Sequence, residues 1–276
     1  MEHAAGLDAG VEEEKENPGP VITIDLLGKL KNFGGMQSYD NPFVVAEAPA
    51  DARATFYRKT YGLVAVAFLG WVLTLFAIFA VGMHIPILNA IMSLGSIGWV
   101  AVLGLFWIAT SVAQSMAFSR SSRATQYMGL AIYVVAEAII FVPLIAIVLM
   151  QAGGSLDTAF REILGPAGGV TALLITGLTV TVFMTRTDFS FLKTAVVLGS
   201  FAALGVIIVV AVCGLSLGAW FSMAMVALMA AAILWQTWKV KNECDTDQYV
   251  GAAVVLFAGF ITMLWYVIRL FMSRRS

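Results

Sequence analysis

Glu137 is the one acidic residue in the apolar segment 126–150. If that segment is a helix, Glu137 lies about 11 residues, or roughly 17 Å, from its start, near the middle of a bilayer. A carboxyl group at that depth is costly and usually marks a path for ions or protons. The alternative is a protonated carboxyl group that hydrogen-bonds to another helix and serves structure. On either interpretation we expect Glu137 to be protonated at neutral pH and to face the protein interior.

Other catalytic and metal-binding patterns are absent from the sequence. Cys213 and Cys244 form no CxxC motif, and His3 and His84 lie far apart in sequence, so neither a zinc site nor a disulfide framework is indicated. No phosphate-binding glycine loop, HExxH or GxSxG motif occurs. An intramembrane protease would need a second carboxylate or a Ser/His pair within the membrane. The sequence therefore predicts a protein that is not an enzyme and has no cofactor or metal site.

The composition identifies the environment of Glu137. Of 276 residues, 60% are hydrophobic and only 12% are charged, about half the charge of a soluble domain. Such a chain cannot cover a soluble surface, so its main partner is the lipid bilayer. The net charge of −1 offers no basic surface for nucleic acid.

Charge-free runs define the membrane spans, because one span needs about 20 apolar residues. The runs lack the alternation of a β-barrel and predict an all-α bundle of seven transmembrane helices. The expected spans are near 61–82, 89–112, 126–150, 163–185, two within 194–238 divided at 213–218, and 248–268, the last continuing to Met272. No Lys occurs in this last span, which excludes a retinal Schiff base.

The basic residues between spans predict the orientation. Nine lie on the side of the N-terminus and four on the other side, which places the N-terminus in the cytoplasm. The nine are Arg53, Arg58, Lys59, Arg120, Arg123, Arg186, Lys193, Lys239 and Lys241, and the four are Arg161, Arg269, Arg274 and Arg275. The basic C-terminal end fits this scheme less well, which leaves a re-entrant last segment as an alternative.

The segment before the first span has a different composition. Residues 1–55 hold ten acidic and four basic side chains and predict an acidic, mostly disordered cytoplasmic tail and linker. Within it, residues 21–33 favour a short amphipathic helix at the membrane surface or a plain linker. No secretory signal begins the sequence, so we expect the first span to direct insertion. The membrane domain is expected over residues 56–272.

Three short motifs lie at span ends. The first span opens Phe-Tyr-Arg-Lys-Thr-Tyr-Gly-Leu, with Thr60 and Tyr61. The turn after the fourth span reads Arg-Thr-Asp-Phe-Ser-Phe-Leu, with Arg186 and Asp188. The last span opens Asp-Gln-Tyr-Val-Gly-Ala-Ala and ends near Ile-Arg-Leu-Phe, with Arg269. Together, and in this order, the motifs resemble the transmembrane Bax inhibitor motif family, including its bacterial branch, over residues 56–272.

The resemblance implies a seven-helix bundle whose last helix is central, and a structural role for the motif residues. It also implies a pH-sensitive calcium leak, or regulation of cell death and stress, with two aspartates in the sixth and seventh spans as the pH sensor. Here those two positions are Gln236 and Gly259. Neither side chain titrates near neutral pH, and calcium prefers carboxylate oxygens. The acid-gated calcium mechanism therefore does not carry over.

Two functions remain open beside that of a plain structural membrane protein. One is a regulator that binds other membrane proteins and uses the acidic tail as a tether. The other is a proton or cation leak channel that uses Glu137, so that protons or calcium are its partners. In both, Gln236 and Thr262 are candidates for polar neighbours of Glu137 by their chemistry.

Overall fold

The structure is a computed structural model that describes residues 44–93, 95–213 and 218–274, and these are helical apart from short connections. The sequence interpretations for residues 1–43, the disordered tail and the amphipathic helix 21–33, lie outside the described residues. The elements are α2 (Ala50–Ala80), α3 (His84–Ser93), α4 (Gly95–Ala117), α5 (Arg123–Gln151), α6 (Leu156–Ala159), the π-helix η1 (Phe160–Leu164), α7 (Gly165–Met184), α8 (Leu192–Cys213), α9 (Ala219–Asn242) and α10 (Tyr249–Ser273).

Six helical stretches are long and apolar enough to cross a membrane. They are α2, α5, the continuous stretch Leu156–Met184 through α6, η1 and α7, residues Leu192–Val210 of α8, α9 and α10. A shorter apolar stretch, Ala101–Ala117, belongs to α4. These helices confirm an all-α, polytopic membrane protein.

The second expected span differs from the structure. The sequence placed one helix near 89–112, whereas the chain forms α3 and then α4, which ends only at Ala117. The expected turn is present, since Gly82 has a positive φ of 77°. The helix resumes at His84. Pro86 then lies in the first turn of α3, where proline is tolerated. Gly95, with φ of 60°, then separates α3 from α4, and no charge in the sequence marks this second break.

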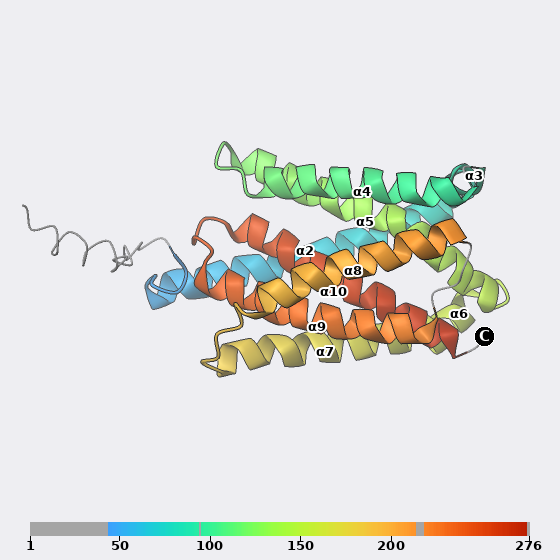
Figure 1. The fold of residues 1–276 in the computed structure, drawn as a ribbon. Coiled ribbons are helices and arrows are strands. Elements are labelled where there is room, and N and C mark those ends of the chain that lie inside the picture. Colours follow the sequence, from blue (N-terminus) through green and yellow to red (C-terminus); the bar gives the residue numbers. More distant parts are fainter. Residues whose placement is uncertain (1–43, 94, 214–217, 275–276) are drawn as a thin grey trace, which may run out of the picture. The chain divides into compact units, whose positions relative to one another are not determined.

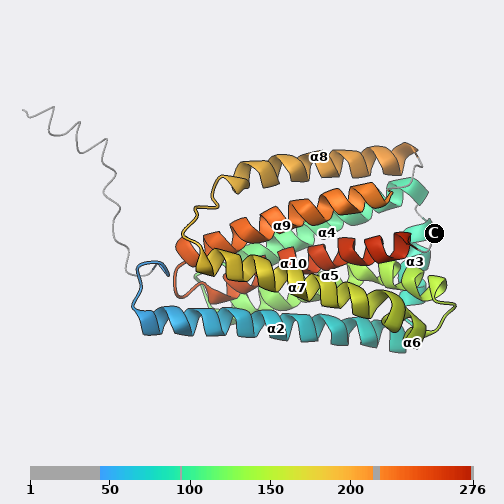
Figure 2. The ribbon, with the colours of Figure 1, turned by 90° about the horizontal axis from the view of Figure 1, so that it is seen from below.

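The last helix is central, as the resemblance implies. Helix α10 contacts α2, α4, α5, α7 and α9, and 72% of its apolar window is buried, more than in any other candidate span among the described residues. It lies between α4 and α7 in Figure 1 and between α8 and α2 in Figure 2. It runs without a break past Arg269 to Ser273, and this continuous helix differs from the re-entrant alternative.

The chain before α2 is hydrogen-bonded to the connection between α9 and α10. Val44 forms an isolated antiparallel bridge with Asp245, and the Val45 amide donates to the Cys244 carbonyl at 2.9 Å. Val45 is fully buried. The described end of the expected linker is therefore part of the bundle, and the first helix begins at Ala50.

Candidate functional site

Glu137 lies on the buried face of α5, and only 4% of it is exposed. Helix α5 begins after Ser122, whose side chain accepts a hydrogen bond from the Thr125 amide at 3.1 Å, as an N-cap does. From that start the helix carries a buried face that includes Tyr133, Glu137 and Phe141. The expectation that Glu137 faces the bundle interior is confirmed.

Tyr133 is the direct polar neighbour of Glu137. Its hydroxyl group lies close to the Glu137 carboxyl group one turn along α5 and to the Gln114 side chain of α4. Glu137, Tyr133 and Gln114, here called the α4–α5 polar chain, are thus polar side chains of two helices that lie close to one another.

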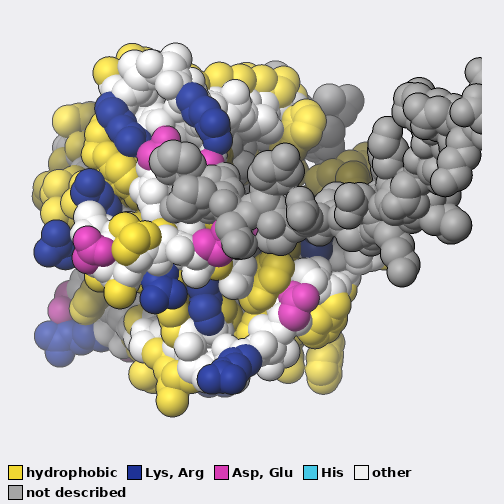
Figure 3. All heavy atoms as spheres, turned by 90° about the vertical axis from the view of Figure 1, so that its left-hand side faces the viewer, with side chains coloured by type: hydrophobic (Ala, Val, Ile, Leu, Met, Phe, Trp, Pro, Cys, Tyr) yellow, Lys and Arg dark blue, Asp and Glu magenta, His cyan; other side chains and the backbone are white. Residues whose placement is uncertain are grey.

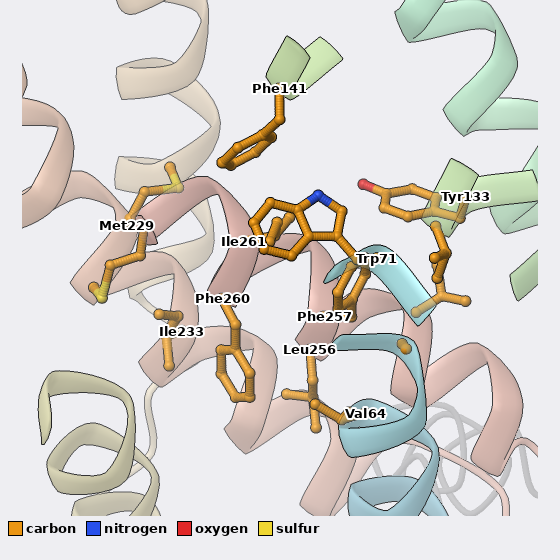
Figure 4. Packing of buried hydrophobic residues seen from close by; sticks show 14 of the residues in the cluster. Val64, Trp71, Tyr133, Phe141, Met229, Ile233, Leu256, Phe257, Phe260 and Ile261 are labelled. Atoms are coloured by element: carbon orange, nitrogen blue, oxygen red, sulfur yellow. The ribbon is translucent and has the colours of Figure 1, made fainter. Parts of the chain in front are cut away.

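Aromatic rings surround this chain. The Tyr133 ring meets Phe257 of α10 edge to face, with 6.2 Å between centroids. Trp71 of α2 packs against Phe141 at 4.8 Å, and Phe141 packs against Trp265 at 4.8 Å. In Figure 4 the hydroxyl end of Tyr133 and the nitrogen of the Trp71 indole point toward one another. That nitrogen is buried and has no hydrogen-bond partner among the described residues.

Gln236 and Gly259 meet where α9 crosses α10. A Cβ atom at Gly259 would collide with Gln236 Oε1 and would lie 3.4 Å from Ile233 Cγ1. Gln236 Oε1 is buried without a hydrogen-bond partner among the described residues. These are the positions at which the family resemblance implies two aspartates.

The structure does not show Gln236 or Thr262 bonded to Glu137. The Thr262 hydroxyl donates to the Ala258 carbonyl of its own helix at 2.7 Å, and Gln236 faces Gly259. Sequence reasoning instead missed Tyr133 and Gln114. The four-residue spacing of Tyr133 and Glu137 was a usable signal, whereas the choice of Gln114 depends on how α4 and α5 meet.

The family-motif residues occupy different environments. Thr60 is fully buried on α2, and its hydroxyl has no hydrogen-bond partner among the described residues. The Tyr61 hydroxyl lies beside the Thr179 hydroxyl of α7. Arg186 is exposed, and Asp188 Oδ1 accepts from the Ser190 amide at 2.8 Å. Arg269 lines a cavity at the far end of the bundle.

Basic side chains gather at the end of the bundle where α2, α5 and α10 begin, as dark blue groups around the face in Figure 3. Tyr249, at the start of α10, lies between two of them, with Lys59 Nζ at 5.0 Å and Arg123 Cζ at 4.9 Å from its ring centroid. Arg123 also donates to the Asp247 carbonyl at 2.6 Å. The motif at the start of α10 therefore anchors the central helix to α2 and α5.

Cys244 lies in the α9–α10 connection, outside the spans, and is only 4% exposed. Burial raises the pKa of its thiol to about 11. Among the described residues, no group of three or more His, Cys, Asp or Glu side chains could hold a metal ion.

The long apolar helices, the buried central helix and the basic end together define a polytopic α-helical membrane protein. The family model described as Inhibitor of apoptosis-promoting Bax1 matches residues 53–276. The chain belongs to this family and is a non-enzymatic, multi-pass membrane protein. A search of curated proteins gave no match.

Proposed function

We propose that this chain is a Bax-inhibitor-type regulator of other membrane proteins that works without a di-aspartate calcium gate. The observation that carries the proposal is the contact between Gln236 and Gly259. Calcium takes about six to eight oxygen ligands and favours carboxylates. The Gln236 amide offers calcium one neutral oxygen, and Gly259 offers no side-chain ligand. The Gln236 side chain also occupies the space beside Gly259.

The proposal includes seven spans with the N-terminus in the cytoplasm. Helix α4 supplies the seventh, because its 23 residues reach roughly 34 Å. Among the described residues, nine Lys and Arg lie toward the end where α2 begins, against Arg161, Arg269 and Arg274 toward the other, which supports the orientation. A single cysteine at position 188 in a cysteine-free background should resist an impermeant thiol reagent added outside the cell.

A proton leak through Glu137 is the second candidate, and the α4–α5 polar chain favours it. The Glu137 carboxyl group and the Tyr133 phenol lie close together on α5, with the Gln114 amide of α4 beside the phenol, and an ionisable side chain inside a membrane bundle usually marks an ion or proton path. We assign Glu137, Gln236 and Thr262 to the polar core of the bundle, with Glu137 as its titratable member.

Flux measurements in proteoliposomes separate the candidates. The regulator should carry neither calcium nor protons from mildly acidic to mildly alkaline pH. The double variant Gln236→Asp/Gly259→Asp should gain a pH-dependent calcium flux. A steep calcium response in the wild-type protein, unchanged in the double variant, contradicts the proposal. A proton flux that Glu137→Gln abolishes establishes the second candidate instead.

A further inference from the structure

We propose that the cavity lined by Arg269 binds a phosphate group, presented by an anionic lipid headgroup or by a soluble anion. The cavity has a volume of about 300 Å³ and lies among the ends of three helices. Its walls include Gln151 from the end of α5, Gly218 and Ser222 from the start of α9, and Arg269 from α10. A cavity of this size lies at the lower end of the range for small-ligand sites.

Arg269 gives the cavity its charge. A guanidinium group carries five N–H donors in a planar fork, so it can bind an oxyanion while it also serves a neighbour in the protein. This fork matches phosphate oxygens in a bidentate way. None of the described residues that line the cavity is acidic, so none of these side chains repels an anion.

The start of α9 adds donors on the same cavity. The N-cap Gly218 provides no side-chain cap, and the first intrahelical bond is that of the Ser222 amide to the Gly218 carbonyl. The amides of the first helical turn therefore lack acceptors within α9 and favour an anion. The Ser222 side chain is 2% exposed and lines the same wall.

The depth of the cavity fits a headgroup. Residues 248–268 carry no charged side chain, and Arg269 is the first charge after this apolar stretch. It therefore lies at the boundary between hydrocarbon and headgroups, and Trp265, one turn deeper on α10, also lines the cavity. Aromatic side chains favour this interface, and basic pockets between membrane helices bind anionic headgroups.

The test uses the purified full-length protein in a neutral detergent. Short-chain phosphatidylglycerol, phosphatidylcholine of the same chain length and inorganic phosphate are titrated separately, and binding is followed by native mass spectrometry and by the shift in thermal unfolding. We expect phosphatidylglycerol to bind more tightly than phosphatidylcholine. Arg269→Gln should weaken its binding on the order of tenfold, and Arg269→Lys should weaken it less.

Arg274→Gln is the matched control, because Arg274 is exposed near the same end of α10 and is not a cavity residue. It should leave binding unchanged. If Arg269→Gln does not fold, Ser222→Ala should still weaken binding a few-fold. Binding of inorganic phosphate that depends on Arg269 would identify a soluble anion as the ligand. Equal binding of both lipids with no response to phosphate, or binding that is insensitive to Arg269 and Ser222, overturns the proposal.

Discussion

Gln236 of α9 occupies the space that a side chain at position 259 of α10 would fill. The two residues are adapted to one another in this packing, since the Gln236 amide oxygen lies where a Cβ atom at position 259 would be. Two aspartates at these positions would form a different crossing, because the shorter side chain at 236 would leave room for a side chain at 259. Glutamine at position 236 and glycine at position 259, in place of the two aspartates that the resemblance implies, are therefore linked by their packing.

The first prediction concerns Gly259→Ala. Its Cβ atom would collide with Gln236 Oε1, which is the end of a flexible side chain and can turn aside, so we expect a small loss of up to about 1 kcal/mol in unfolding free energy, below the usual cost of an overpacked core. Thermal unfolding in detergent measures the effect. Gly259→Ala/Gln236→Ala should regain part of the loss, because the second substitution removes the obstructing amide. Additive losses would contradict the proposed adaptation.

The second prediction concerns Gly129→Ala, where α5 crosses α4. A Cβ atom there would lie 2.5 Å from the Ala113 carbonyl oxygen and 2.7 Å from the Ala117 amide nitrogen. Backbone atoms cannot move aside as a side chain can, so the two helices must separate. We expect destabilisation of at least about 1–3 kcal/mol in the same unfolding assay.

Gly177→Ala is the control for both glycine substitutions. Gly177 is in α7, and a methyl group at this position would meet no heavy atom within 4 Å beyond the helix itself. Alanine should therefore be neutral or stabilise the helix by up to about 1 kcal/mol. A comparable loss at all three glycines would show that the effect is not steric.

The third prediction concerns the turn between α7 and α8. Asp188→Ala removes the acceptor of the Ser190 amide and should cost about 1 kcal/mol of stability. Asp188→Asn should retain most of it, and Thr187→Ala, at an exposed neighbouring position, should have little effect. A loss of function at an unchanged unfolding temperature would instead make Asp188 a functional residue.

Charge-free runs predicted most of the helices because the bilayer imposes a length and a composition on each span. The break between α3 and α4 was missed since it depends on the positive φ of Gly95 and not on any charge. The burial of Glu137 was predictable from the cost of exposing a carboxyl group to lipid.

The neighbours of Glu137 were harder to predict. Which helix supplies them depends on close contacts between small residues, such as Gly129 against Ala113, and these occur throughout the sequence. Chemistry alone therefore suggested Gln236 and Thr262, whereas Tyr133 is the polar side chain beside Glu137 and Gln114 lies beside Tyr133. The resemblance predicted the central position of α10, which hydropathy does not encode.

The fourth prediction concerns Cys244, a buried residue of the α9–α10 connection whose carbonyl accepts a hydrogen bond from the amide of buried Val45. Because burial raises the pKa of its thiol to about 11, the folded state disfavours the thiolate. The unfolded chain therefore releases the thiol proton at a lower pH than the folded protein does. The stability of the fold is undiminished below the ordinary thiol pKa, and it falls as the pH rises from there toward about 11. Maleimide labelling at neutral pH should be slow at Cys244.

Val45→Asp should accelerate that labelling, because a charge at this buried position disrupts the segment that is hydrogen-bonded to Cys244. Cys213 is exposed, so its labelling rate in the same detergent sample serves as the internal reference and should not change. Fast labelling of Cys244 in the wild-type protein would contradict the observed burial.

The fifth prediction tests whether the α4–α5 polar chain serves structure. Glu137→Gln keeps the shape and the hydrogen-bonding capacity of the side chain, so it should leave thermal unfolding nearly unchanged. Glu137→Leu removes the carboxyl group beside the buried Tyr133 hydroxyl and should cost about 1–3 kcal/mol. Tyr133→Phe, which removes the hydroxyl itself, should cost a similar amount.

The double variant Glu137→Leu/Tyr133→Phe decides the matter through a double-mutant cycle. Once both polar groups are gone, no buried partner is left unsatisfied between them, so the combined loss should be smaller than the sum of the single losses. Strictly additive losses would mean that the two side chains do not stabilise one another. A proton flux that Glu137→Gln abolishes, at an unchanged unfolding temperature, would assign Glu137 to transport, because the amide preserves the fold and removes only the ability to ionise.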